Sequence, residues 1–373
     1  MMEKPTAVSF AIPKSSMRRS PPVLKSGVSL WIKKNLFDSI YSTALTLFAI
    51  WALLITLPDF FSWAVLNAVW QTDDPAMCRQ AAGACWAVIA EKHRVMLFGT
   101  FPYEEHWRGV LVILLIVGTA ALSVFKRFWS YWLFFVWLGL TGILLVLLLG
   151  GVFGLAETGT HQWGGLPLTL FMFVGTVVGG MPLAIVLALG RTSSLPAVKS
   201  LCLAFTEIVR GVPLITVLFM ASLMFPLFMP EGLTINKFLR AQIGMILFFG
   251  AYAAEIVRGG LQAIERGQYE AADSIGLDYW QKTKRIILPQ ALRVVLPALM
   301  NDIIRAFKNT TFVSIIGLFD VLGATATALE DPLWVLYALE AYVFIFVIYL
   351  VFCYAMSKYS ERVENDLRRG RNL

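Results

Sequence analysis

The chain has 373 residues, of which 58% are hydrophobic and only 15% are charged. Soluble domains carry about 25% charged residues, so this composition excludes a protein whose whole surface faces water. The net charge of +7 does not indicate nucleic-acid binding, because the basic residues fall between apolar spans, as they do in the loops of membrane proteins.

Eight apolar segments are long enough to cross a membrane, which takes about 20 residues per helix. In chain order they cover 36–57, 107–125, 131–151, 166–190, 211–229, 238–257, 294–317 and 334–356. We therefore predict an all-α fold, a polytopic transmembrane helical bundle of about eight spans.

The spans divide the chain into four predicted regions. Residues 1–35 form a basic tail with several prolines, and 36–160 hold three spans with a polar loop between the first two. Residues 161–358 hold five spans with polar loops, and 359–373 form a second tail. A glycine-rich linker separates the three-span region from the five-span region.

The distribution of Lys and Arg predicts the orientation. If the N-terminus lies inside, the inside segments hold 23 of these residues and the outside segments hold 6. Loops that stay on the cytoplasmic side carry an excess of Lys and Arg. We therefore predict a multi-pass membrane protein with both termini in the cytoplasm.

The predicted inside segment 259–290, between the sixth and seventh spans, is long and polar; we call it the EAA segment. Its first part predicts a short helix over 269–275, with Glu270 near the N-terminal end, where the helix dipole favours a carboxylate. Gly276 suits the end of that helix.

The second part of the EAA segment predicts another helix over 279–287. Asp278 can cap its first turn, and Pro289 is expected to end it. Ala271 and Ala272 in the first helix are small, so a partner could approach the backbone closely there. The alternative for the whole segment is an amphipathic helix that rests on the membrane surface.

The spacing within this segment resembles the EAA loop of ABC importer membrane subunits. The matching positions are Glu270, Ala271, Ala272, Gly276, Ile286, Leu288 and Pro289. In that family the loop is the coupling helix, which seats in a cleft of a cytoplasmic ATPase and transmits its closure to the membrane helices. The resemblance implies the same role for these residues.

Three further stretches, 205–219, 250–276 and 308–323, are similar to polar amino-acid permeases. The similarity covers about 166–357 and implies a type I ABC importer-like five-helix core. The three extra N-terminal spans and the loop between the first two resemble the longer membrane subunit of general L-amino-acid importers.

The resemblance implies a transport subunit, not an enzyme, in the bacterial inner membrane. Because the chain has no GxxxxGK[ST] phosphate loop, ATP would be used by partner ATP-binding cassette subunits, and we predict neither a cofactor nor a metal on this chain. Further implied partners are a sister permease in a heterodimer, a periplasmic solute-binding protein and an amino-acid substrate. The competing hypothesis is a secondary amino-acid transporter or channel that is not driven by ATP.

The seventh span contains four polar residues, Asn301, Asp302, Arg305 and Lys308. The three charged ones are spaced by three and so share roughly one helix face. Charges inside a membrane face a bundle interior or a wet cavity, so Arg305 could meet a substrate carboxylate and Asp302 an ammonium. The alternative is structural: Asp302 and Arg305 neutralise each other while Lys308 reaches the outer surface.

Three smaller features lead to further expectations. Cys78 and Cys85 share the polar loop of the three-span region, where they either form a disulfide, as an oxidising space favours, or remain two free thiols on one helix. Glu207 and Arg210 precede the fifth span and are expected to form a solvated ion pair. A GxxxG pattern, Gly175 to Gly179, can bring the fourth span close to another helix.

Overall fold

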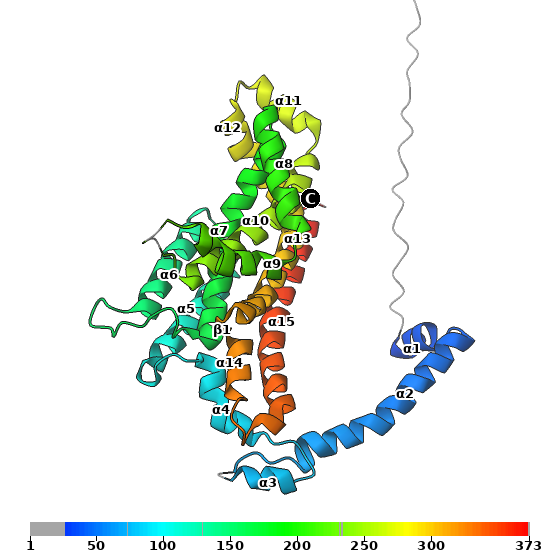
Figure 1. Cartoon of the computed structure of the whole chain (residues 1–373). Coiled ribbons are helices and arrows are strands. Elements are labelled where there is room, and N and C mark those ends of the chain that lie inside the picture. The colour runs from blue at the N-terminus through cyan, green and yellow to red at the C-terminus, as the bar shows by residue number, and fades with distance from the viewer. Residues whose placement is uncertain (1–26, 73, 129, 231, 233, 372–373) are drawn as a thin grey trace, which may run out of the picture. The chain divides into compact units, whose positions relative to one another are not determined.

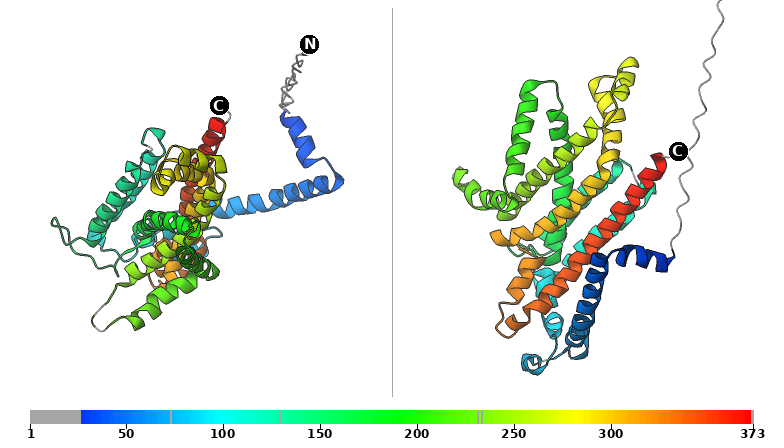
Figure 2. Two further views of the ribbon diagram at one scale, coloured as in Figure 1. Left: turned by 90° about the horizontal axis from the view of Figure 1, so that it is seen from above. Right: turned by 90° about the vertical axis from the view of Figure 1, so that its right-hand side faces the viewer.

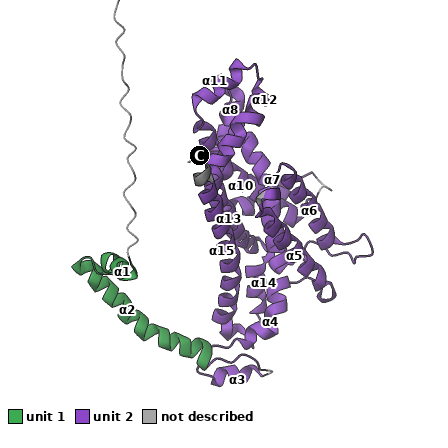
Figure 3. Ribbon diagram, turned by 180° about the vertical axis from the view of Figure 1, so that it is seen from behind, with its two compact units in different colours: residues 1–66 green, residues 67–373 purple. Residues whose placement is uncertain are grey.

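The computed structural model describes residues 27–72, 74–128, 130–230, 232 and 234–371 (Figure 1). The predicted tail therefore lies outside the described residues as far as residue 26. The chain divides into two compact units, Met1–Leu66 and Asn67–Leu373 (Figure 3). The predicted all-helical bundle is confirmed: the described residues include seven helices long and apolar enough to cross a membrane, or eight if one bent pair counts as a span.

The first unit contains α1 (Val28–Leu36), α2 (Ile40–Phe61) and the π-helical turn η1 (Ser62–Leu66). Helix α2 starts four residues later than the predicted first span, because Ser39 caps it by accepting a hydrogen bond from the Ser42 amide at 3.1 Å. Helix α1 was not expected within the tail; the prolines that argued against a helix all precede residue 23. Helix α2 has no buried residue, as suits a helix surrounded by lipid.

The first part of the second unit adds two further spans and a folded connection before them. Its elements are α3 (Pro75–Gln80), α4 (Ala87–Phe98), η2 (Tyr103–Glu105), α5 (His106–Ser123), η3 (Lys126–Phe128) and α6 (Trp132–Leu149). Helix α4 lies in the predicted polar loop and was missed. Lys92 on α4 binds Asp331 at 2.8 Å and thereby lowers the pKa of that carboxyl.

The next elements are α7 (Gly165–Arg191), α8 (Pro196–Gly211), α9 (Leu214–Phe219), η4 (Met220–Met224), η5 (Phe225–Phe228) and α10 (Lys237–Gln262). The predicted fifth span, 211–229, corresponds to the helical stretch Leu214–Phe228. Helix α8 precedes that stretch and meets it at 104°. The bend falls at Val212 and Pro213, where the proline has no amide to continue the helix.

Helices α7 and α10 pack in parallel through small residues on α7. A Cβ atom added to Gly179 would lie 2.7 Å from the Ile246 side chain, and one added to Gly180 would lie 2.6 Å from Phe249. Gly175 similarly faces Gln242. Because larger side chains would not fit, the GxxxG pattern does bring two helices together here.

The remaining elements are α11 (Arg266–Ser274), α12 (Tyr279–Lys282), η6 (Thr283–Ile287), α13 (Leu288–Asn309), η7 (Thr310–Ile316), β1 (Phe319–Asp320), α14 (Val321–Ala328), η8 (Val335–Tyr337) and α15 (Ala338–Arg371). The prediction that Pro289 ends a helix is wrong. Pro289 stands in the first turn of α13, where the missing amide costs little. The seventh span is therefore continuous with the second helix of the EAA segment, over Tyr279–Ile316. Figure 2 shows the yellow EAA segment at one end of the second unit.

Candidate functional site

The first helix of the EAA segment, α11, is fixed to its own chain by three polar contacts. The Tyr269 hydroxyl donates to the Leu261 carbonyl at 3.2 Å, and burial raises the pKa of that phenol. Lys282 Nζ lies 2.5 Å from Asp273 Oδ1, and the Gln290 amide donates to Gln268 at 3.1 Å. These contacts tie α11 to the end of α10 and to the start of the seventh span.

The turn between α11 and α12 matches the sequence prediction. Gly276 has φ +74°, a conformation that favours glycine, and the Leu277 amide donates back to the Ala272 carbonyl at 3.2 Å. Asp278 caps α12 in a capping box with Gln281. The end of α11 and the start of α12 are thus both capped by hydrogen bonds, so the tip is a defined helix–turn–helix.

The matched residues divide between the interior and the surface. Ala272 is only 1% exposed and packs inside its own chain. Ala271, Gly276 and Pro289 are exposed. Glu270 is also exposed, but it lies in the second turn of α11 because that helix begins at Arg266, to which Glu270 is paired at 3.2 Å.

The tip carries a cluster of exposed large apolar side chains next to these positions. Ile275 is 71% exposed, Trp280 is 70% exposed and Tyr279 is 51% exposed. Ile286 and Leu288, by contrast, are partly buried against the core between α7, α10 and α13. The EAA segment therefore combines an anchored base with an apolar tip, an arrangement typical of protein interfaces.

The polar residues of the seventh span separate in the structure. Asp302 is 6% exposed and pairs with Arg305. The Arg305 guanidinium lies 4.1 Å from the centre of the Tyr252 ring, within cation–π range, and lines a small pocket between α7, α9, α10 and α13. Asn301 and Lys308 are exposed, so only Asp302 and Arg305 of the predicted set act together.

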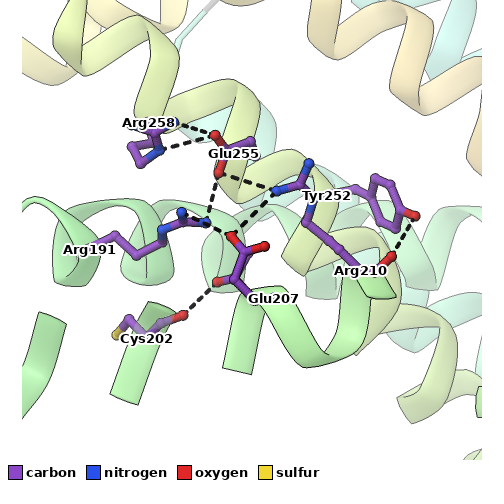
Figure 4. A network of polar contacts seen from close by, with 8 residues as sticks. Arg191, Cys202, Glu207, Arg210, Tyr252, Glu255 and Arg258 are labelled. Atoms are coloured by element: carbon purple, nitrogen blue, oxygen red, sulfur yellow. Dashed lines mark hydrogen bonds and ion pairs between the residues drawn. The ribbon is translucent and has the colours of Figure 1, made fainter. Parts of the chain in front are cut away.

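Five charged residues from three helices form a network that the sequence did not indicate (Figure 4). Arg191 binds Glu255 at 2.7 Å and Glu207 at 3.2 Å. Arg210 lies 3.4 Å from Glu255, and Arg258 also pairs with Glu255. The expected pair of Glu207 and Arg210 is present, at 3.8 Å, as part of this network. The sequence held one sign of this network: Glu255 is a carboxylate just before the end of a predicted apolar span, where it needs a cationic partner.

Tyr252 joins this network to the buried pair. Its hydroxyl donates to the Arg210 carbonyl at 3.2 Å, and its ring also lies 5.5 Å from the Arg210 guanidinium. The same ring supports Arg305. A continuous series of polar and aromatic groups therefore runs from Asp302 to Arg191.

Cys78 and Cys85 are joined by a disulfide in the structure, with their Cα atoms 5.6 Å apart. Both are buried, and the Cys85 amide donates to Glu340 of α15 at 2.9 Å. The Val69 amide donates to the Ala84 carbonyl at 2.8 Å. The bridge thus closes a small loop that packs against α15 within the second unit.

We expect alkylation of the unreduced, denatured protein to label Cys202 and Cys353 but neither Cys78 nor Cys85, because a bridged sulfur has no free thiol. Peptide mass spectrometry reads the result. Reduction before alkylation is the control and should yield label at all four positions. Label at both loop cysteines without reduction would show two free thiols instead.

Comparison with known proteins gives the family. A family model described as a binding-protein-dependent transport system inner membrane component matches residues 180–368. The inner membrane amino-acid ABC transporter permease protein YhdY of Escherichia coli (strain K12) is 44% identical over 352 residues, which cover 93% of this chain and 95% of that protein. The glutamate/glutamine/aspartate/asparagine transport system permease protein BztC of Rhodobacter capsulatus is 36% identical over 419 residues, which cover 94% and 96%.

Among solved structures, a crystal structure of an amino acid ABC transporter with histidines matches 55% of this chain and 92% of its own, with 30% sequence identity and a TM-score of 0.47. The family model and the two relatives, which cover nearly the whole chain, are sufficient to assign the family. This chain belongs to the family of binding-protein-dependent transport system inner membrane components.

Proposed function

We propose that this chain is the membrane-spanning permease subunit of an ABC importer that moves L-amino acids into the cell. Two relatives, one described as an amino-acid ABC transporter permease and one as a glutamate/glutamine/aspartate/asparagine transport system permease, each match more than nine tenths of the chain. The observation that carries the proposal is the EAA tip, a helix–turn–helix anchored at its base and apolar at its surface. A secondary transporter or a channel has no use for such a docking element.

In this proposal the tip seats in a cleft of a separate ATP-binding cassette ATPase. Trp280, Ile275 and Tyr279 supply the apolar contact, since exposed aromatic residues dominate the binding energy of protein interfaces. Glu270 and Ala271 lie on the exposed part of α11 and contact the same partner. Ala272 and the partly buried Ile286 and Leu288 hold the tip in position, while Gly276 permits the turn.

The substrate pathway passes the Asp302–Arg305 pair. An amino acid carries a carboxylate and an ammonium, and the planar Arg305 guanidinium can bind the carboxylate through two hydrogen bonds. Asp302 Oδ2 is buried and has no hydrogen-bond partner among the described residues, so it can accept from the ammonium. Asn301 and Lys308 lie away from this pair and are not needed for it.

The remaining assignments follow the resemblance. Residues 161–358 form the five-span permease core, and 36–160 supply three additional spans. A sister permease completes the translocation pathway, and a periplasmic solute-binding protein delivers the amino acid. ATP binding by the partner ATPase closes its dimer, and the core helices then change the side of the membrane to which the pathway opens.

Both termini and the EAA segment lie in the cytoplasm in this proposal, as the Lys and Arg distribution supports. Alkaline phosphatase fused after Gly83 should then be active, because the enzyme forms its disulfides only in the periplasm. The same enzyme fused after Phe128 should be inactive although expressed to the same level. Activity only in the second fusion would reverse the orientation.

Reconstitution tests the function directly. The chain is co-expressed with the genes that adjoin its own, and the purified complex is placed in proteoliposomes with the binding protein outside and ATP inside. We expect uptake of radiolabelled L-amino acids that requires ATP and that vanadate abolishes. Uptake that persists without ATP and follows an imposed ion gradient would support the secondary transporter instead.

A further inference from the structure

A basic pocket lies at the end of the second unit that carries the EAA segment. It has a volume of about 420 Å³. Its lining residues are Arg191, Thr192, Lys199, Leu203, Arg258 and Gln262. They come from the C-terminal ends of α7 and α10 and from the first half of α8. Three of the six are cations and none is a carboxylate, so the pocket suits an anion.

Two carboxylates balance part of the pocket's charge. Glu255 pairs with Arg191 and Arg258, and Glu207 pairs with Arg191 (Figure 4). With Arg210 and Lys199 the cluster holds four cations and two carboxylates. Among the described residues none forms an ion pair with Lys199, and its side chain is exposed. The two carboxylates thus fix the arginines in place and leave an excess of positive charge at the opening.

The pocket also lies at the ends of two apolar spans. The apolar spans Gly165–Arg191 and Lys237–Gln262 run in parallel and both end at it. On the pocket side, Leu203 of α8 lines the pocket and is 41% exposed, and Leu195, just before α8, is 61% exposed. A cationic pocket that continues into an apolar surface matches a molecule with an anionic head and hydrocarbon chains.

We propose that this pocket binds the phosphate headgroup of an anionic phospholipid, with the acyl chains lying along α8. Basic pockets between membrane helices recognise such headgroups. Arg191 and Arg258 donate to the phosphate oxygens, as guanidinium groups do in phosphate sites. Lys199 completes the site at its opening and Gln262 offers its amide. By holding α8 against α7 and α10, the lipid would stabilise the helix that precedes the 104° bend.

The test measures lipid retained by the complete, purified transporter. The complex is taken from nanodiscs of phosphatidylethanolamine with a minority of phosphatidylglycerol, and native mass spectrometry counts the lipids that stay bound. The variant is Lys199→Gln, which removes the exposed cation and leaves the ion-pair network intact. The matched control is Arg293→Gln, which removes an exposed cation of α13 outside the pocket.

We expect retained phosphatidylglycerol to fall about fivefold in Lys199→Gln, since one cation near the headgroups contributes about that factor. Arg293→Gln and the rescue variant Lys199→Arg should match the wild type, and phosphatidylethanolamine should not be enriched. Equal retention in Lys199→Gln and wild type would overturn the proposal. So would displacement of the lipid by inorganic phosphate, which indicates a free-anion site, or retention only after removal of the ATPase, which indicates a protein interface.

Discussion

Ala272→Asp is expected to reduce amino-acid uptake and binding-protein-stimulated ATPase activity at least tenfold. The Ala272 side chain is 1% exposed, so the new carboxylate must either be buried without a partner or force α11 away from its own chain. An unpaired buried charge costs several kcal/mol. This cost exceeds the stabilisation that the three polar contacts give to the position of α11. The tip would then lose the position from which it meets the ATPase.

The control for this variant is Gly267→Asp on the same helix. Gly267 is exposed, and a Cβ atom there would meet nothing within 4 Å. The charge is the same, but it stands in the first turn of α11, where the helix dipole favours it. We expect near-normal transport, so the comparison separates burial from charge. Normal uptake in Ala272→Asp proteoliposomes would refute the role assigned to α11.

Gly276→Asp should have a smaller effect than Ala272→Asp. The position has open space around it, so only the backbone resists a side chain at φ +74°. That resistance is about 1–2 kcal/mol. The order of the two variants therefore distinguishes the packing of α11 from the conformation of the turn that follows it.

Arg305→Ala is expected to abolish assembly of the transporter, whereas Arg305→Lys should assemble normally but transport poorly. Removing the guanidinium leaves Asp302 as a buried charge without its partner, a change that costs about 3–5 kcal/mol. Lysine restores the charge but not the planar fork or the same contact with the Tyr252 ring. If Arg305 grips the substrate carboxylate, the lysine variant should show a raised KM for uptake with unchanged basal ATPase activity.

Lys308→Gln is the matched control for the Arg305 variants, because Lys308 is exposed on the same helix. It should assemble and transport like the wild type. Assembly is measured by size-exclusion chromatography of the detergent-solubilised complex. Wild-type uptake kinetics in Arg305→Lys, together with lost assembly in Arg305→Ala, would leave Asp302 and Arg305 as a structural pair only.

The sequence was a good guide to features that depend on local composition. Apolar length located the spans, and the capping preference of Asp278 and the backbone freedom of Gly276 predicted the turn of the EAA segment. Hydropathy carries no direction, however, so it could not give the 104° angle between α8 and the fifth span at Pro213. Pro289 was misread because a proline suits the first turn of a helix as well as the position after its last.

Contacts between distant segments were beyond the reach of sequence patterns. The burial of Ala272 depends on helices that lie before and after the EAA segment in the chain. The network of Glu255 with Arg191 and Arg210 joins three helices, and no spacing rule relates their positions. Asp302 and Arg305 were found because their contact lies within one helical turn.

The continuity of Tyr279–Ile316 has a mechanical consequence. Its 38 residues form a rod roughly 57 Å long at 1.5 Å per residue, with Trp280 near one end and Arg305 well inside the other half. A rotation of this rod by about 5° around one end displaces the other end by about 5 Å, close to the 5.4 Å rise of one helical turn. A small tilt at the tip therefore moves the far end of this rod, beyond Arg305, farther than it moves the residues near the tip.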